Sequence, residues 1–382
     1  MELLDYPLWW VSNSYDLLLY TGNRSYFDTY YQTIVNTLDT FYPSVTNTTT
    51  QLITKGVGVS GSYGDYAFLA RTGAITYINA LYVLALNDAA SIATFLGGHD
   101  DDAARWTARA QNVSDAINSQ LFDNSVGAYF DGACGSSPCP THAQDGNSLS
   151  IVSGTANSSR AESVLSYISS SMTLPYGNAF YDNDVVGAGY SQRVYAFISY
   201  FELEARFISG LPETALEEIR RLYGWMAGND PGTTMWEGIG TSGLPYEAAY
   251  TSLSHGWSTG IVPVLTNYVL GVIPTGPGFS TWSIKPMPGD VQWANGQVPT
   301  PIGPINVNWN NSHDFALSLN APTASSGAVW VPVSNSSTPV YVNSDLVWPS
   351  TSSSYTPQYN GGYVGLEVQG GKYYVTVGSS GQ

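Results

Sequence analysis

Residues 73–96, GAITYINALYVLALNDAASIATFL, and residues 100–121, DDDAARWTARAQNVSDAINSQL, decide the fold of this chain. Apolar and aromatic side chains recur in both segments at the spacing of a helix face, and Gly97-Gly98 separates them. Two helices joined by so short a loop are expected to pack antiparallel. The stretch therefore predicts a helical hairpin.

The same pattern continues through the first 270 residues, where Gly- and Pro-rich loops interrupt helical periodicity. Further helices are predicted over residues 8–20, 24–41, 145–154, 159–170, 190–209, 213–228 and 248–271. The loops at 43–72, 122–144 and 229–247 are long and carry most of the Gly, Tyr, Trp and carboxylate residues, which is typical of functional loops. The first domain, residues 1–273, is therefore expected to be a toroid of helical hairpins with its pocket at the loop end.

The residue pattern of the sequence changes after Pro274. Short alternating runs rich in Val, Thr and Tyr follow, separated by Gly, Pro and Asn, and such runs predict strands. We expect a small C-terminal β-sandwich over residues 280–382, with residues 274–278 as a hinge. The expected fold class is mainly α: an (α/α)6 six-hairpin toroid, incomplete at its N-terminus because nine helices are fewer than six hairpins need, followed by the β-sandwich.

The composition of the chain argues against some classes of binding partner. The chain has 382 residues, 43% of them hydrophobic, so it can bury a substantial core. Its 12 basic and 29 acidic residues give a net charge of −17, which repels phosphate backbones and anionic membrane surfaces. No run approaches eighteen uninterrupted apolar residues. We therefore expect neither nucleic acid nor a membrane as partner.

Secretion is expected from two features. Cys134 and Cys139 are the only cysteines, and their loop suits a local disulfide. Asn-X-Ser/Thr sequons begin at six positions, namely Asn23, Asn47, Asn112, Asn157, Asn310 and Asn335. The N-terminus shows no basic segment followed by an apolar one, so no signal peptide is visible. Either a leader has been removed or the chain begins late.

The strongest candidates for catalytic and binding residues lie in two segments. The first is Thr233-Thr234-Met235-Trp236-Glu237-Gly238-Ile239-Gly240, and the second, His255-Gly256-Trp257-Ser258, starts eighteen residues after Glu237. Cleavage of a glycosidic bond needs carboxylates, and a sugar ring packs on flat apolar faces. Glu237 is the candidate general base, with a helix-capping Glu as the alternative. His255 could bind a sugar hydroxyl or hold the base, although a single histidine at a helix start is more often structural. Trp236 and Trp257 supply the indoles.

Other polar loops are weaker candidates. Asp65 and Tyr66 could contact a sugar, but Asp beside Gly is also an ordinary turn. Asp145 and Asn147 either contact a sugar or cap a helix. The polar groups of residues 178–183 either line a cleft or close a turn. Trp9 and Trp10 are expected in the core, with a contact of one indole with the pocket as the alternative. Phosphate-binding and dinucleotide-binding glycine motifs and a His-x-x-x-His pair are absent from the sequence, so hydrolysis without cofactor or metal is expected.

These residues resemble the fungal branch of the α-L-rhamnosidase family of six-hairpin glycosidases. The resemblance rests on residues 3–10 (LLDYPLWW) with Tyr20-Thr21-Gly22, on Gly64-Asp65-Tyr66, on Trp236-Glu237-Gly238, and on Ser254-His255-Gly256-Trp257-Ser258-Thr259-Gly260 through Leu270-Gly271-Val272. It implies an inverting hydrolysis of terminal α-L-rhamnosyl groups of plant polysaccharides or glycosides. It further implies that Glu237 is the base, that His255 binds the sugar, and that Asp65 with Tyr66 forms the loop lining the rhamnose pocket.

One family feature has no counterpart in this sequence. The general acid of the family lies in an acidic motif that precedes the first matching segment, and we find no such motif. We therefore expect this chain to be a fragment lacking N-terminal hairpins. Two alternatives stay open: a catalytically inactive sugar-binding protein, and a polysaccharide lyase on the same toroid. The small number of Lys and Arg residues argues against the lyase, which must neutralise a uronate.

Overall fold

The computed structural model describes residues 2–54, 61–62, 71, 73–134, 137–187, 189, 191–229, 234–246, 251–350 and 355–378. Two compact units divide the chain. The first contains residues 1–15 and 25–261, and the second contains residues 16–24 and 262–382. The boundary thus lies earlier than the sequence predicts, and the second unit also includes a segment from the N-terminal part of the chain.

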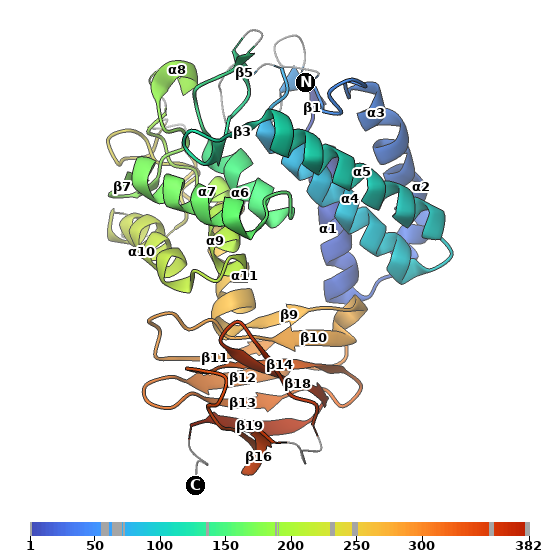
Figure 1. Cartoon of the computed structure of the whole chain (residues 1–382), viewed down its shortest axis with the longest axis vertical. Coiled ribbons are helices and arrows are strands. Elements are labelled where there is room, and N and C mark those ends of the chain that lie inside the picture. The colour runs from blue at the N-terminus through green and yellow to red at the C-terminus, as the bar shows by residue number, and fades with distance from the viewer. Residues whose placement is uncertain are drawn as a thin grey trace. The chain divides into compact units, whose positions relative to one another are not determined.

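The first unit is helical, as predicted (Figure 1). Its main helices are α1 (Tyr6–Thr21, whose last residues belong to the second unit), α2 (Ser25–Asn36), α3 (Tyr42–Ser44), α4 (Thr76–Leu96), α5 (Asp100–Gln120), α6 (Gln144–Val152), α7 (Ser158–Ser171), α8 (Asp184–Gly187), α9 (Ala196–Ile208) and α10 (Pro212–Asn229). Helix α11 (Ile261–Val264) starts at the last residue of this unit and otherwise belongs to the second. A π-helical segment, Thr37–Phe41, joins α2 to α3, and a 3₁₀ segment, Gly256–Gly260, precedes α11.

Short strand pairs lie between the helices of this unit. They are β1 (Glu2–Leu3) with β2 (Gly61–Ser62), β3 (Phe122–Asp123) with β4 (Ala128–Tyr129), β5 (Ala133–Cys134) with β6 (Ser137–Pro138), and β7 (Thr173–Leu174) with β8 (Gly177–Asn178). Cys139 follows β6 and is disulfide-bonded, which confirms the predicted disulfide.

The α4–α5 pair forms the predicted hairpin, and the two helices lie side by side in Figure 1. Most side chains of α4 are buried. Gly97 ends α4 at φ 76°, a left-handed conformation that favours glycine, and its N–H bonds to the carbonyl of Ala93. The first turn of α5 carries Asp100, Asp101 and Asp102, which favour the positive end of the helix dipole. Helix α4 is also long and apolar enough to cross a membrane, but 67% of its most apolar window is buried in the protein, as in the core helix of a globular domain.

The second unit is a β-sandwich of two sheets. One sheet has the order β17-β18-β14-β10-β9, and the other has the order β11-β12-β13-β19-β15-β16. The strands are β9 (Val272–Pro274), β10 (Thr281–Ile284), β11 (Trp293–Val298), β12 (Ile305–Asn310), β13 (Ala316–Asn320), β14 (Ser326–Pro332), β15 (Val340–Val342), β16 (Asp345–Trp348), β17 (Gln358–Asn360), β18 (Tyr363–Gln369) and β19 (Lys372–Val377). Buried residues alternate with exposed or partly exposed ones along β12, β13 and β14, as in strands that cover a core on one face.

The predicted hinge at residues 274–278 is wrong. The chain there connects β9 to β10, which pair antiparallel with Trp282 opposite Pro274, so this segment lies inside one sheet. Strand β9 is preceded by a π-helical segment, Leu265–Leu270, that belongs to the same unit. The sheet thus begins several residues before the expected domain start at residue 280.

The predicted helix over 248–271 is wrong for residues 251–255 and correct in its later part. His255 has extended backbone angles, and helical structure begins at Gly256. The backbone before it pairs with the segment around Glu237 instead, because the carbonyl of Ser252 accepts from the Glu237 N–H. A helix there would withdraw that carbonyl from the pairing.

Candidate active site

The Glu237 segment is held on both sides by backbone hydrogen bonds. Ile239 exchanges two bonds with Val194, at 2.8 and 2.9 Å. On the other side the Glu237 N–H donates to the Ser252 carbonyl at 2.9 Å, and the His255 N–H donates to the Met235 carbonyl at 2.9 Å. The segment therefore behaves as a central strand, so the Cα of Glu237 has little freedom to move.

The carboxylate of Glu237 is held by two further donors. The Tyr246 hydroxyl donates to Oε1 at 2.9 Å, and the backbone N–H of Ser252 donates to Oε2 at 3.0 Å. The Glu237 side chain is nevertheless 19% exposed. Each carboxylate oxygen has a second lone pair, so the group can accept a hydrogen bond from a water or a sugar hydroxyl.

Glycines bring Tyr246 to Glu237. A Cβ added at Gly238 would lie 2.7 Å from Cδ1 of Tyr246, and one added at Gly240 would lie 3.1 Å from its Cα. The phenol ring therefore packs directly on this backbone. The guanidinium of Arg193 lies over the Tyr246 ring, 5.0 Å from the ring centre. The two glycines that follow Glu237 thus have a packing role that the sequence pattern does not reveal.

His255 and Trp257 stand beside the carboxylate. Nδ1 of His255 lies 3.8 Å from Oε2 of Glu237, and the imidazole is 32% exposed. The imidazole and the Trp257 indole are 4.5 Å apart between ring centres, and the indole N–H donates to the Glu237 carbonyl at 3.3 Å. Trp257 also stacks on Phe197, with ring centres 5.2 Å apart. The result is a carboxylate, an imidazole and an indole on one partly exposed surface.

Trp236 does not belong to that surface. Its side chain is 3% exposed, and its carbonyl accepts a hydrogen bond from the Ser258 hydroxyl at 2.7 Å. The prediction that Trp236 contacts the substrate is therefore corrected, because the indole lies in the core. Asp65 and Tyr66 lie outside the described residues, so their predicted place in the pocket stays a prediction.

A second polar cluster surrounds Arg71. Its guanidinium donates to Asp145 at 2.8 and 3.0 Å, to Asp131 at 2.7 Å and to the Tyr181 hydroxyl at 3.0 Å. Burial raises the pKa of Asp131 to about 6. The positive charge of Arg71 lowers this pKa, but only partly offsets burial, and the negative charge of Asp145 raises it further. Asp145 is fully buried in the first turn of α6, where its Oδ1 also accepts from the backbone N–H of Gly146 at 2.6 Å, so the capping alternative describes it better than an open sugar contact. Arg71 is a residue that the sequence analysis missed.

Two further predicted polar positions are structural. The Asn147 side chain bonds both backbone groups of Tyr129, at 2.7 and 2.8 Å, which ties α6 to β4. Asp182, from the 178–183 segment, accepts from the His142 ring at 2.7 Å and from the Tyr167 hydroxyl at 2.7 Å. Burial alone would raise the pKa of Asp182, but these hydrogen bonds lower it. Trp9 packs on Phe201 with ring centres 5.0 Å apart, although its side chain remains partly exposed.

The described residues contain no group of three or more His, Cys, Asp and Glu side chains arranged to hold a metal ion. The chemistry available at Glu237 is that of a fixed carboxylate beside an imidazole and aromatic faces. On a helical toroid followed by a β-sandwich, such a site defines the class of six-hairpin glycosidases.

Comparison with known proteins places the chain within that class. Residues 5–174 match the family model of the bacterial α-L-rhamnosidase six-hairpin glycosidase domain, and residues 271–344 match that of the bacterial α-L-rhamnosidase C-terminal domain. Two parts of the chain are therefore similar to two domains of bacterial α-L-rhamnosidases. The expected link to the fungal branch has no support here, since both matching family models are bacterial.

Solved structures agree on the fold. A GH78 family rhamnosidase of Bacillus sp. GL1 is 26% identical with a TM-score of 0.66, and the match covers 81% of this chain and 31% of that one. The α-L-rhamnosidase of Dictyoglumus thermophilum has a TM-score of 0.71 at 16% identity, over 94% of this chain and 38% of that one. That of Streptomyces avermitilis, complexed with L-rhamnose, has a TM-score of 0.68 at 19% identity, over 94% and 32%. This chain thus spans about a third of the length of these proteins. No curated protein sequence matches it.

Proposed function

We propose that this protein hydrolyses terminal α-L-rhamnosyl groups of plant polysaccharides or glycosides, with Glu237 as general base. The observation that carries the proposal is the Glu237 carboxylate itself, which is fixed by Tyr246 and Ser252, is reachable from solvent, and lies 3.8 Å from the His255 imidazole. The two rhamnosidase domain models that match this chain support the choice of sugar.

In an inverting reaction Glu237 accepts a proton from the water that attacks the anomeric carbon, while a general acid protonates the leaving oxygen on the opposite face. His255 is suited to donate a hydrogen bond to a sugar hydroxyl, and the Trp257 indole offers an apolar face to the sugar ring and its methyl group. An extracellular place of action belongs to the same proposal and rests on the sequons and the disulfide at Cys139.

The test is release of p-nitrophenol from p-nitrophenyl α-L-rhamnoside by the wild-type chain and by Glu237→Gln. The variant keeps the shape of the side chain but cannot accept the proton, so we expect turnover to fall by about 10²–10⁴-fold. Glu217→Gln is the matched control, because that side chain is 70% exposed and lies in the same unit. Unchanged turnover in Glu237→Gln would contradict the proposal, and proton NMR of the first product anomer tests inversion.

A second function is favoured by the imidazole and the indole beside Glu237, which can hold a sugar without taking part in proton transfer. The protein would then bind rhamnosyl groups without cleaving them. Isothermal titration with L-rhamnose separates the two functions, since binding by a well-folded wild-type chain that shows no turnover favours a sugar-binding protein. A product that absorbs in the ultraviolet, with an unsaturated ring, would instead indicate a lyase.

A further inference from the structure

The six-stranded sheet of the second unit has an exposed face rich in uncharged polar side chains. Register places Asn295 opposite Asn308, Asn308 opposite Ser318, and Ser318 opposite Tyr374, so one row of polar residues crosses four strands. A second row contains Asn306, Asn320 and Lys372. The opposite face of the same strands carries buried residues such as Val307 and Leu317.

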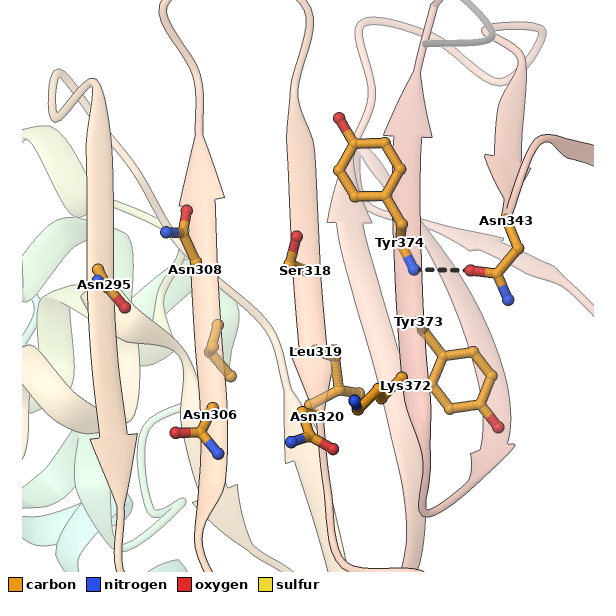
Figure 2. A pocket seen from close by; sticks show the side chains of 11 residues that line it. Asn295, Asn306, Asn308, Ser318, Leu319, Asn320, Asn343, Lys372, Tyr373 and Tyr374 are labelled. Carbon is orange, nitrogen blue, oxygen red and sulfur yellow. Dashed lines mark hydrogen bonds between the residues drawn. The ribbon is translucent and has the colours of Figure 1, made fainter. Parts of the chain in front are cut away.

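These rows line a hollow of about 380 Å³ on the sheet. Figure 2 shows Asn295, Asn308 and Ser318 side by side on neighbouring strands, with Tyr374 beyond them and Lys372 in the second row. The volume lies in the range of about 300–1,000 Å³ that is usual for small-ligand sites. Among the residues that line the hollow, Lys372 is charged and none is acidic, although the chain as a whole carries a net charge of −17.

Two aromatic side chains on this face are open to solvent. Tyr374 is 44% exposed and lines the hollow, and Trp293 is 65% exposed. Trp293 precedes Asn295 by two residues on β11, so it projects from the same face about 7 Å along the strand. Asn343 is held at the far side of the hollow, because its Oδ1 accepts from the Tyr374 backbone N–H at 2.9 Å. Two exposed aromatic rings near an amide that a hydrogen bond holds in place are unusual on a surface that contacts only water.

We propose that this face is a second saccharide-binding site, which takes a neutral oligosaccharide chain. An amide both donates and accepts hydrogen bonds, as vicinal sugar hydroxyls do, so a row of Asn side chains suits that ligand. Strands lie about 4.8 Å apart, and the amides therefore repeat across the sheet as hydroxyls repeat along a sugar chain. The exposed phenol and indole supply faces on which sugar rings pack. A polyanionic ligand is disfavoured, because a single lysine lines the hollow while the chain as a whole carries a net charge of −17.

The site is built from the second unit, whereas the Glu237 site is built from the first. The proposal therefore does not depend on turnover at Glu237. Binding is best measured on the full chain carrying Glu237→Gln, so that hydrolysis cannot consume the ligand. The probes are xylohexaose, cellohexaose, mannohexaose and neutral arabinogalactan, with polygalacturonate as the polyanionic control, in isothermal titration and affinity electrophoresis with saturating L-rhamnose present.

We expect at least one neutral probe to bind, and Tyr374→Ala and Asn308→Ala each to weaken that binding roughly tenfold. Tyr359→Ala is the matched control, because Tyr359 is 42% exposed and lies on β17 of the other sheet. Asn308→Ala shortens an exposed side chain, so it tests the proposal even if Tyr374→Ala unfolds. The proposal is overturned if no neutral probe binds, if polygalacturonate alone binds, or if Tyr359→Ala weakens binding as much as the other two variants.

Discussion

At the residue scale, the Tyr246 hydroxyl is the contact that most directly controls Glu237. Replacing Tyr246 by Phe removes the donor to Oε1 and leaves the ring packed on Gly238. A hydrogen bond to a charged group contributes about 1.5–3 kcal/mol, so we expect kcat to fall by about tenfold or more, with a smaller change in KM. Steady-state kinetics on the nitrophenyl rhamnoside measures both.

Tyr176→Phe is the control for that experiment. Tyr176 also loses a hydroxyl contact, to the carbonyl of Thr241 at 3.1 Å, but it does not bond Glu237. Equal losses in the two variants would show that any hydroxyl in this region matters and that Tyr246 has no special role as a positioning residue.

The Arg71 cluster makes a second prediction at this scale. Arg71→Met leaves Asp131 and Asp145 buried without their cation, and breaking a buried ion pair typically costs about 3–5 kcal/mol. Arg105→Met removes a guanidinium that is 41% exposed and bonded to Asp39 and Asp102, so its expected cost is about 1 kcal/mol or less. Urea denaturation at pH 7 compares the two variants, and a smaller loss for Arg71→Met than for Arg105→Met would refute this account of the cluster.

The residues of the candidate site differ in how far sequence could predict them. Glu237, His255 and Trp257 lie in short motifs whose side chains suit sugar chemistry, and the structure brings these three together. Tyr246 could not be predicted, because its contact depends on a turn that brings it onto Gly238. Trp236 was misassigned, since a motif does not reveal which of two neighbouring indoles lies in the core.

At the scale of elements, periodicity predicted most of the helices because each buries a continuous apolar face. It failed at residues 251–255, where the backbone pairs with the Glu237 segment instead of with itself. It also missed α8, which is only four residues long and carries too little periodic signal. The two failures have different causes: pairing between distant segments leaves no local pattern, and a single helical turn is too short to show one.

Helix α7 offers a test of a predicted element boundary. The side chain of its N-cap residue, Asn157, accepts from the Arg160 N–H at 3.0 Å. Asn157→Ala should lower the free energy of unfolding by about 1 kcal/mol, since that N–H loses its partner. Ser159→Ala is the control, because it removes the same sequon without touching the cap. If both variants lose the same stability in urea denaturation, the cap contributes nothing.

At the scale of the whole molecule, buried carboxyls sit among a large excess of negative charge. Glu202 and Glu218 are both fully buried, and they share Asn178, which donates to Glu202 at 2.7 Å and to Glu218 at 2.9 Å. Burial, and then the charge of Glu202, raises the pKa of Glu218 to about 7 despite the neighbouring Arg221. Glu218 and Asp131 are thus two carboxyl groups whose protonated forms are favoured in the folded state.

The pH dependence of stability follows from the direction of these shifts. A carboxyl whose pKa is raised on folding stabilises the folded state below its unfolded pKa, and that contribution is lost as pH rises through the folded value. Glu218 and Asp131 therefore favour folding more as pH falls from about 7 to about 4.5. Asp123 and Asp182 have lowered pKa values, so their contribution disappears only at lower pH, below about 4. Stability is thus expected to peak at about pH 4–5.

Thermal unfolding followed by circular dichroism between about pH 3 and pH 8 tests this expectation. The wild-type Tm should rise as pH falls from neutrality to the peak and then drop. Glu218→Gln, which is neutral throughout, should show a shallower rise over the neutral-to-acid range. Glu217→Gln, one position earlier and largely exposed, should keep the wild-type slope. A Tm that climbs steadily towards pH 8 would contradict the argument, because ionising buried carboxyls among so many other negative charges can only weaken the fold.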